Sequence, residues 1–333
     1  MKTDQFVLAS RPYGMPSAAN FRIEKINLEE LKDNEVLLKS WYISVDPYMR
    51  GRMNDTKSYV EAFQVNQPIN GSIVAKVIES KSNKIQTGDV VVGALPWSVF
   101  SVENADKLRK IDGKKIPPYF YLGILGMPGL TAYIGMIDFC RPAKGKTVVV
   151  SGAAGAVGLI AGQIAKIKGA KVIGIAGSDE KCNLLKETFG FDDAINYKTT
   201  KSIRKELGTL CAQGVDAYFD NVGGEITEGV VANLNFRARI ALCGQISQYN
   251  STKLPAGNLV MAWILTKSIT LQGFIVRGFP ERYEEALTNL TQWLTEDKLK
   301  YTETIIHGFD NLPDAFLGLF SGKNQGKMLV EIE

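Results

Sequence analysis

A chain of 333 residues that is 45% hydrophobic and 22% charged has the composition of a globular protein and the length of about two domains. Its 39 basic and 35 acidic residues are mixed along the chain and leave a net charge of only +4, so we expect no nucleic-acid binding. No apolar stretch reaches the roughly 18 residues of a membrane helix, and the first residues lack the apolar core of a signal peptide, so we expect a cytoplasmic protein without a membrane partner.

Residues 1 to about 120 are predicted to form a mostly β domain. They lack helical periodicity and are rich in turn residues. Alternating, β-branched stretches at residues 34–46, 71–80 and 87–97 have the pattern of half-buried strands, and the last of them begins at a Gly-Asp turn.

From about residue 123 to residue 298 the pattern changes to strands that alternate with helices. The predicted strands are residues 147–152, 171–177, 193–197, 215–222, 238–244 and 269–276. Apolar residues at helical spacing occur at 158–169, 180–190 and 280–299. Alternation of this length predicts an α/β fold with a doubly wound parallel sheet. Residues 302–333 are predicted to form a strand, a short helix and a final strand, and to return to the β domain.

Residues that bind metals are few and scattered. The four cysteines are Cys140, Cys182, Cys211 and Cys243, without a Cys-x-x-Cys pair, and the only histidine is His307. This spacing fits neither a zinc site nor a disulfide framework, and a single histidine in an amphipathic C-terminal stretch is more often a surface or core residue than a catalyst. We therefore expect no metal and no histidine-based acid–base catalysis.

A glycine-rich turn follows the predicted strand of three valines. Ala153 stands at the place of the first glycine of the usual G-x-G-x-x-G fingerprint, Gly155 would let the backbone approach a pyrophosphate, and Gly158 would let the helix pack close to the strand. A purely structural turn is the alternative, but the strands on both sides favour nucleotide binding. The residues expected to meet the nucleotide here are Gly152, Ala153, Gly155, Ala156, Val157 and Gly158.

The end of the next strand indicates which nucleotide fits. An Asp or Glu there would bond the ribose hydroxyls of NAD and repel a 2′-phosphate, but residues 176–178 are Ala-Gly-Ser. Ser178 can donate a hydrogen bond, Lys181 follows one helical turn later, and Tyr197 ends the strand after the adjacent crossover. The acids at 179–180 fall in a first helical turn, where acids are common capping residues. The pattern predicts NADPH, with a merely solvated Lys181 as the alternative.

Stretches along nearly the whole chain resemble one family. They include LASRPYGMPSAANFRIE, SVDPYMRGRM, LGMPGLTAYIGM, DNVGG, CGQISQYN, LQGFIV and GKNQGKMLV. The chain is similar to the zinc-independent medium-chain dehydrogenases/reductases of the leukotriene B4 12-hydroxydehydrogenase/prostaglandin reductase group, nearest to bacterial NADPH-dependent curcumin reductases. The resemblance implies a GroES-like catalytic β domain from residues 1–122 and 300–333, a Rossmann NADPH-binding domain from residues 123–299, and a homodimer.

The resemblance also assigns residues to the cofactor. Lys181 and Tyr197 match the residues that hold the 2′-phosphate. The other matching positions line the cofactor or flank its nicotinamide, and they are Met127, Pro128, Thr131, Asn221, Cys243, Gly244, Phe274, Ile275, Val276 and Asn324. For residues 274–276 the match is to a segment whose backbone holds the nicotinamide amide.

The activity that the resemblance implies is NADPH-dependent reduction of the C=C bond of α,β-unsaturated ketones and aldehydes, small molecules such as curcumin or 15-oxoprostaglandins. Zinc enzymes of the superfamily have a Gly-His-Glu stretch where this chain has PINGSIV, and a four-cysteine lobe that is missing here. Without zinc to polarise an alcohol, the chain suits an already activated alkene. A zinc-free quinone oxidoreductase and a non-catalytic NADPH-binding protein stay open as alternatives.

Hydride addition to the β-carbon of such a substrate leaves negative charge on the carbonyl oxygen, where a neutral tyrosine hydroxyl is a good hydrogen-bond donor. Tyr249 in ISQYN matches the family's active-site tyrosine and is the first candidate, and Tyr48 in DPYMRG is the second. Arg50 and Arg52 either attract an acidic substrate or pair with carboxylates of the β domain, and the sequence favours neither.

Overall fold

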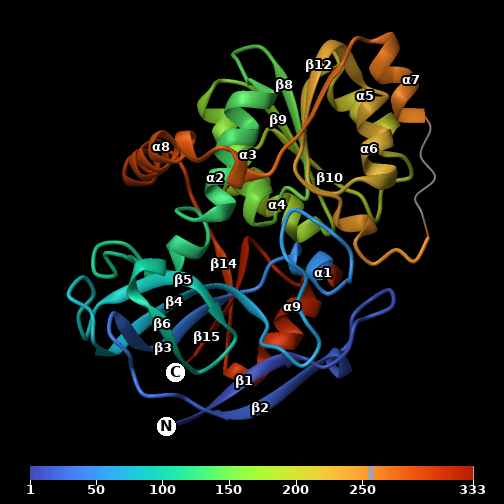
Figure 1. Cartoon of the computed structure of the whole chain (residues 1–333). Coiled ribbons are helices and arrows are strands. Elements are labelled where there is room, and N and C mark those ends of the chain that lie inside the picture. The colour runs from blue at the N-terminus through green and yellow to red at the C-terminus, as the bar shows by residue number, and fades with distance from the viewer. Residues whose placement is uncertain (254–258, 333) are drawn as a thin grey trace. The chain divides into compact units, whose positions relative to one another are not determined.

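The computed structural model of the chain describes residues 1–253 and 259–332 (Figure 1). The chain divides into two compact units. Unit 1 consists of Met1–Gly123, Glu303–Asn324 and Met328–Glu333, and unit 2 consists of Ile124–Thr302 and Gln325–Lys327. Within the described ranges, no helix combines the length and the apolar character needed to cross a bilayer.

Unit 1 is built on antiparallel strands. Its seven-stranded sheet has the order β14-β15-β3-β4-β5-β7, β6 pairs with β3 beside this path, and β1 and β2 form a separate antiparallel pair. The strands predicted at 34–46, 71–80 and 87–97 are present as β3, β4 and β5. The bounds are β1 Lys2–Leu8, β2 Phe21–Asn27, β3 Glu35–Ser44, α1 Met49–Arg52, β4 Asn70–Ser80, β5 Val90–Pro96, β6 Phe100–Asn104, β7 Arg109–Lys110, β14 Glu303–His307, α9 Leu312–Ser321 and β15 Lys327–Glu331.

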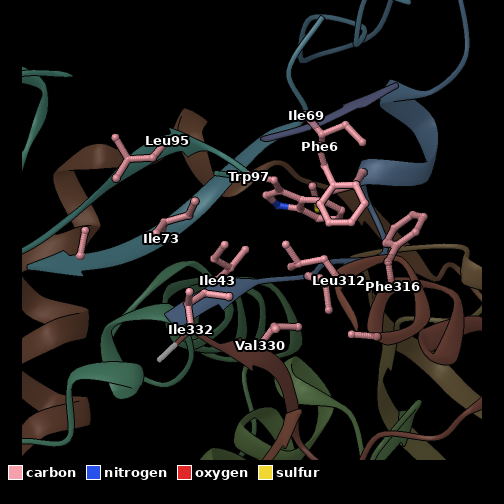
Figure 2. Packing of buried hydrophobic residues seen from close by; sticks show 14 of the residues in the cluster. Phe6, Ile43, Ile69, Ile73, Leu95, Trp97, Leu312, Phe316, Val330 and Ile332 are labelled. Atoms are coloured by element: carbon pink, nitrogen blue, oxygen red, sulfur yellow. The ribbon is translucent and has the colours of Figure 1, made fainter. Parts of the chain in front are cut away.

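The core of unit 1 combines N-terminal strands with the C-terminal tail. Trp97 is 1% exposed and stacks on Phe21 with ring centroids 6.3 Å apart. It also meets the edge of Phe316 at 6.5 Å. Figure 2 shows Trp97 and Phe316 gathered with Phe6 and Val330 in one apolar cluster. Because Phe316 lies on α9 and Val330 on β15, the tail completes a core that the first strands begin.

Unit 2 contains a six-stranded sheet in the order β10-β9-β8-β11-β12-β13, with parallel pairing throughout. This is the order of a doubly wound dinucleotide-binding sheet, whose switch point lies here between β8 and β11. The predicted α/β class, a β domain plus a doubly wound parallel-sheet domain, is confirmed. The strands are β8 Thr147–Ser151, β9 Lys171–Ala176, β10 Asp193–Asn196, β11 Val215–Asp220, β12 Leu234–Leu242 and β13 Thr270–Gly273.

The first four of these strands end one or two residues before their predicted ends, and β12 and β13 differ more. β13 ends at Gly273 rather than at residue 276, because residues 276–278 form a 3-10 turn. β12 begins at Leu234, earlier than the predicted residue 238, and its pairing with β11 shifts register at its start. The φ of +60° at Arg237 lies within this irregular start, which alternation of apolar residues cannot reveal.

The helices of unit 2 cover a sheet whose central strand β8 is buried at all five positions. The helix predicted at 280–299 is present as α8, and a 3-10 turn replaces its first three predicted residues. The bounds are α2 Met127–Ile134, η4 Gly135–Cys140, α3 Ala156–Ile167, α4 Asp179–Glu187, α5 Ile203–Leu210, α6 Gly224–Val231, η5 Ile246–Gln248, α7 Leu259–Thr266, η6 Val276–Gly278, η7 Pro280–Arg282 and α8 Tyr283–Thr295.

Candidate functional site

The glycine turn joins the end of β8 to the start of α3. Gly152 has a φ of +58°, a value that favours glycine, and Gly155 is the N-cap of the helix. A Cβ at Gly158 would lie 2.3 Å from the Gly152 carbonyl oxygen, so the helix approaches the turn too closely for a side chain. The N–H groups of Ala156 and Val157 belong to the first turn of α3, where helical geometry leaves donors for an anion.

A short segment near the C-terminus belongs to unit 2 and lies against this turn. The Gly326 N–H donates to the Ala154 carbonyl at 2.8 Å, and Gly326 forms an isolated parallel bridge with Gly155. Gly326 has a φ of +63°, and a Cβ there would lie 1.9 Å from the Thr302 carbonyl oxygen. The contact with the turn therefore requires glycine. Asn324, a predicted cofactor residue, lies two positions earlier and belongs to unit 1.

The end of β9 brings together the three residues predicted to select NADPH. Ser178 is the N-cap of α4, and its Oγ accepts a hydrogen bond from the Lys181 N–H at 3.2 Å. The Tyr197 N–H donates to the Ala176 carbonyl at 3.0 Å. The tyrosine ring covers Gly177, where a Cβ would lie 3.0 Å from its Cε1 atom. At 42% exposure, Tyr197 stays open to solvent beside the strand end.

The charges around Lys181 favour binding of an anion. Burial and the positive charge of Lys198 lower the pKa of Lys181, and Glu180 opposes this shift. Two lysines that repel each other are both stabilised by a phosphate between them, because it supplies the opposite charge. Lys198 was not among the predicted site residues. In the sequence, only its position directly after Tyr197 could have indicated a role at this site.

Each acid in the first turn of α4 accepts a hydrogen bond from a side-chain amide. Asn196 Nδ2 donates to Asp179 Oδ1 at 2.8 Å, and Gln325 Nε2 donates to Glu180 Oε1 at 2.8 Å. The acids occupy the first helical turn as predicted, but the cap itself is Ser178. Gln325 links the C-terminal segment to α4, a contact between distant residues that no local pattern indicates.

The ends of β11 and β12 lie beside the glycine turn. Asn221 Nδ2 donates to the Ser151 carbonyl at 2.8 Å. The Asp220 carbonyl accepts hydrogen bonds from the N–H groups of Cys243 at 2.9 Å and Gly244 at 3.0 Å. Three predicted cofactor residues, Asn221, Cys243 and Gly244, are thus gathered at the switch point of the sheet, where doubly wound sheets bind ligands.

Tyr249 follows the short turn η5 after β12. Ser247 fixes this turn, since its N–H and its hydroxyl both donate to the Val222 carbonyl, at 3.1 and 2.6 Å. The Tyr249 hydroxyl accepts a hydrogen bond from the Gln245 N–H at 3.4 Å. A Cβ at Gly244 would lie 3.1 Å from that hydroxyl. The hydroxyl therefore lies against a predicted cofactor residue at the switch-point edge.

The segment after β13 contains the three residues predicted to hold the nicotinamide amide. The Phe274 ring is buried, with its centroid 5.1 Å from that of Phe139 and 6.4 Å from that of Phe219. Val276 is also buried, whereas Ile275 is exposed. The Phe274 side chain belongs to an aromatic cluster of the core, and the contact between this backbone and the nicotinamide stays a prediction.

The start of α2 carries the other residues predicted to flank the nicotinamide. Thr131 Oγ1 donates to the Met127 carbonyl at 2.7 Å, which fixes both residues on one helical turn. Pro128, between them, is buried. A Cβ at Gly129 would lie 1.8 Å from the Ile124 carbonyl oxygen, so glycine is required where the helix turns over the preceding chain.

Tyr48 lies in unit 1, at the start of α1, and packs against the core of that unit. Arg50 is 3% exposed and donates to the Gly14 carbonyl at 2.8 Å and to Asn54 Oδ1 at 2.7 Å. These contacts join two loops of unit 1, so Arg50 has a structural role there.

Arg52 also anchors a loop of unit 1. Its guanidinium donates to the Glu61 carbonyl at 2.9 Å and to Asn70 Oδ1 at 2.8 Å. The same group lies 3.9 Å from the centroid of the Phe63 ring. These contacts of the two arginines are with carbonyl and amide oxygens of unit 1, and attraction of an acidic substrate stays a hypothesis.

The chain matches known proteins along its whole length. One family model, described as the N-terminal domain of oxidoreductase, matches residues 4–111, and another, described as zinc-binding dehydrogenase, matches residues 156–292. The NADPH-dependent curcumin reductase of Escherichia coli is 41% identical over 333 residues, which cover 98% of this chain and 96% of that protein. The NADP(+)-dependent 2-alkenal reductase of Nicotiana tabacum is 42% identical over 334 residues, covering 98% and 97%.

A solved structure agrees with these relatives. CurA of Vibrio vulnificus in complex with NADPH is 43% identical, has a TM-score of 0.94, and covers 99% of both chains. This chain belongs to the medium-chain dehydrogenase/reductase family. The resemblance stated from the sequence motifs is confirmed.

One of the two matching family models is described as zinc-binding dehydrogenase, but this chain has few residues of the types that bind zinc. In the part of the chain that the structure describes, no three His, Cys, Asp or Glu side chains are grouped to hold a metal ion. Burial raises the pKa of Cys140 and of Cys243 to about 12, so both thiols are protonated at neutral pH in the metal-free protein. His307 Nδ1 lies 3.2 Å from Glu331 Oε2 in unit 1. Metal independence stays a prediction.

Proposed function

We propose that this medium-chain reductase uses NADPH to reduce the C=C bond of α,β-unsaturated ketones and aldehydes. The observation that carries the proposal is the end of β9, where no acid stands at 176–178 and where Ser178, Lys181 and Tyr197 gather. The relatives named for NADPH-dependent curcumin reduction and 2-alkenal reduction support the same chemistry. Curcumin-like or 15-oxoprostaglandin-like enones are the proposed substrate class.

The residues of unit 2 fit NADPH. The first turn of α3 offers backbone N–H donors to the pyrophosphate, and Gly158 lets that helix pack close to the glycine turn. Lys181 and Tyr197 would hold the 2′-phosphate, and Asn221 would line the nucleotide at the switch point. When bound, NADPH supplies the hydride.

Tyr249 is the proposed donor to the substrate carbonyl. Negative charge develops on that oxygen as the β-carbon is reduced, and a neutral hydroxyl placed there stabilises the transition state. The Tyr249 hydroxyl lies against Gly244, at the edge where the cofactor residues gather. Tyr48 of unit 1 is the second candidate for this role.

The test is to follow NADPH oxidation with trans-3-nonen-2-one, with an ortho-quinone and without an acceptor. We expect oxidation with the enone, formation of the saturated ketone, and a strong preference for NADPH over NADH. Oxidation with the quinone alone would instead identify a quinone oxidoreductase. Tight NADPH binding with no turnover on any acceptor would identify a non-catalytic binding protein.

We also propose that the chain forms a homodimer through the β13 edge of the unit 2 sheet. All four residues of β13 are exposed, including Leu271, and the neighbouring α7 exposes Met261 and Leu265. An exposed edge strand beside apolar side chains is a ready surface for a second copy. Light scattering should give twice the chain mass, and Leu265→Glu should give monomers. A monomeric wild-type protein would contradict the proposal.

The cytoplasmic location, the lack of nucleic-acid binding and the division of roles between a catalytic and an NADPH-binding domain are proposed as well. The mixed charge of the chain supports the first two, and the clustering of predicted cofactor residues in unit 2 supports the third. Cell fractionation and a DNA-binding assay at low salt test the first two. Recovery with membranes or DNA would contradict them.

A further inference from the structure

A buried carboxylate, Asp220, ends β11 at the switch point of the unit 2 sheet. The residue is 1% exposed. Its carboxylate accepts hydrogen bonds from three hydroxyls and two backbone N–H groups. Oδ1 accepts from Ser151 Oγ at 3.0 Å and from the Tyr218 hydroxyl at 2.8 Å, and Oδ2 accepts from Thr227 Oγ1 at 2.6 Å. Burying a charge costs free energy unless such donors compensate for lost water, so this position needs the whole set.

Three of the donors connect Asp220 to loops that carry predicted cofactor residues. The N–H groups of Val222 and Gly223 donate to Oδ1 at 2.9 and 3.0 Å, which fixes the loop after β11. Ser151, the third connection, directly precedes the glycine turn, and its Oγ also accepts the Asn221 N–H at 3.0 Å. One carboxylate therefore holds the glycine turn and the loop of Asn221 in a fixed relation.

The loop after β11 is also hydrogen-bonded to the turn on which Tyr249 lies. The Val222 carbonyl accepts both the N–H and the hydroxyl of Ser247, and the Asp220 carbonyl accepts the N–H groups of Cys243 and Gly244. A shift of the loop at Val222 would consequently move the turn on which Tyr249 lies. The path from Asp220 to the tyrosine consists of hydrogen bonds between consecutive loops at one edge of the sheet.

We propose that Asp220 is a positioning residue that aligns the glycine turn with the Tyr249 turn, so that cofactor and substrate carbonyl are held in one geometry. The proposal rests on the proposed function, because it assumes that NADPH binds at this edge. Asp220 itself contacts neither ligand. A neutral side chain of the same shape weakens its hydrogen bonds without opening a cavity, which makes the effect on alignment separable from loss of folding.

The experiment compares Asp220→Asn with Asp216→Asn, a control on the same strand. Asp216 lies at the other end of β11, where its Oδ2 accepts the Thr147 N–H at 3.0 Å and its Oδ1 lies 3.2 Å from Lys146 Nζ. We measure the Tm of the free protein, the Kd of NADPH by fluorescence, and kcat with trans-3-nonen-2-one. Asp220→Asn should weaken NADPH binding and lower kcat, each by about tenfold, as expected for weakened charge-assisted hydrogen bonds. Asp216→Asn should lower the Tm and leave the Kd of NADPH and kcat unchanged.

A second pair of variants applies if Asp220→Asn does not fold. Ser151→Ala and Thr227→Val each delete one hydroxyl donor to the same carboxylate, but only Ser151 leads into the glycine turn. Ser151→Ala alone should raise the Kd of NADPH. Equal Kd values in these two variants, or an Asp220→Asn protein that changes only in Tm, would overturn the positioning role. A wild-type protein that neither binds NADPH nor reduces the enone would overturn the proposed function, and this proposal with it.

Discussion

The two ends of β11 carry the same residue type in opposite surroundings. At the amino end, the Asp216 side chain is 24% exposed and pairs with Lys146, a surface lysine. At the carboxyl end, Asp220 is 1% exposed and is surrounded by hydroxyl and backbone donors. The first arrangement ties neighbouring strands together at the surface. The second fixes loops at the edge where doubly wound sheets bind ligands, so the same carboxylate chemistry serves stability at one end and the site at the other.

The glycines of α3 show the same contrast along one helix. A Cβ at Gly158 would lie 2.3 Å from the Gly152 carbonyl oxygen, at the start of the helix. A Cβ at Gly162, one turn further on, would lie 2.0 Å from the Phe191 ring, in the core. Both positions require glycine for close packing, but only Gly158 packs against the glycine turn.

The largest effect is expected for Tyr249→Phe, at the edge of the unit 2 sheet where the strands have their carboxyl ends. The substitution removes the hydroxyl beside Gly244 and keeps the ring, so packing should survive. Loss of a donor to the developing charge should lower kcat by roughly 10²–10³-fold and change KM less. Steady-state kinetics with trans-3-nonen-2-one measure both values, and Tyr48→Phe is the matched variant. Unchanged turnover in Tyr249→Phe would leave the reaction class standing and move the donor role to Tyr48, water or the cofactor ribose hydroxyl.

Gly158→Ala tests the glycine contrast. The new methyl group would collide with the turn, so we expect a loss of about 1–3 kcal/mol in stability and up to about a hundredfold in NADPH affinity. Gly162→Ala should cost similar stability, because it collides with Phe191, and should leave the NADPH Kd of the folded protein unchanged. Chemical unfolding and fluorescence titration separate the two quantities. The same loss of affinity in both variants would show that position along the helix does not matter.

Lys181→Ala tests the predicted contact with the 2′-phosphate at the end of β9. Removing the ammonium group should raise the KM for NADPH about tenfold, the value of one hydrogen bond to a charged group, and should leave the KM for NADH nearly unchanged. Lys186→Ala, further along α4, is the control, since that lysine lies 4.0 Å from Asp193. An equal rise for both cofactors would return Lys181 to the role of a solvated surface residue.

The smallest effect is expected for Glu303, a carboxyl group in unit 1 that contrasts with Asp220. Its Oε1 atom is buried without a hydrogen-bond partner among the described residues, and burial raises the pKa of Glu303 to about 7. The folded state thus prefers the protonated form. The stability that protonated Glu303 contributes to the fold is fully present below the ordinary pKa of about 4.5, falls as the pH rises toward 7, and is absent above 7.

Glu303→Gln should therefore stabilise the protein above pH 7 by on the order of 1 kcal/mol and have little effect near pH 4. Thermal unfolding of the two proteins between pH 4 and pH 8 measures the difference. Curves that stay parallel over this range would mean that Glu303 is not protonated in the fold.

Much of this molecule follows from local patterns. Three consecutive valines before glycines indicate β8 and its turn, and the missing acid at 176–178 indicates the nucleotide, because both features lie within a few adjacent residues. Sequence patterns did not reveal the contacts that join distant segments of the chain. The Gln325–Glu180 hydrogen bond spans 145 positions, and the Ser151–Asp220 hydrogen bond spans 69. Such contacts depend on strand order and register, which alternation of residue types does not encode.

The C-terminal segment illustrates the same limit. Gly326 is one of 32 glycines, and nothing in its neighbours shows that its N–H will meet the Ala154 carbonyl. Its requirement for glycine appears only when the backbone of Thr302 is placed beside it. The fold class was therefore predictable from spacing, whereas the supports of the candidate site were not.

The fate of a hydride label tests the proposed alkene reduction most directly. Wild-type protein is incubated with NADPH that carries deuterium at the transferred C4 position and with trans-3-nonen-2-one, and the product is analysed by NMR. We expect the saturated ketone with deuterium on the β-carbon. An allylic alcohol with deuterium on the carbonyl carbon would show carbonyl reduction instead and would contradict the proposed reaction.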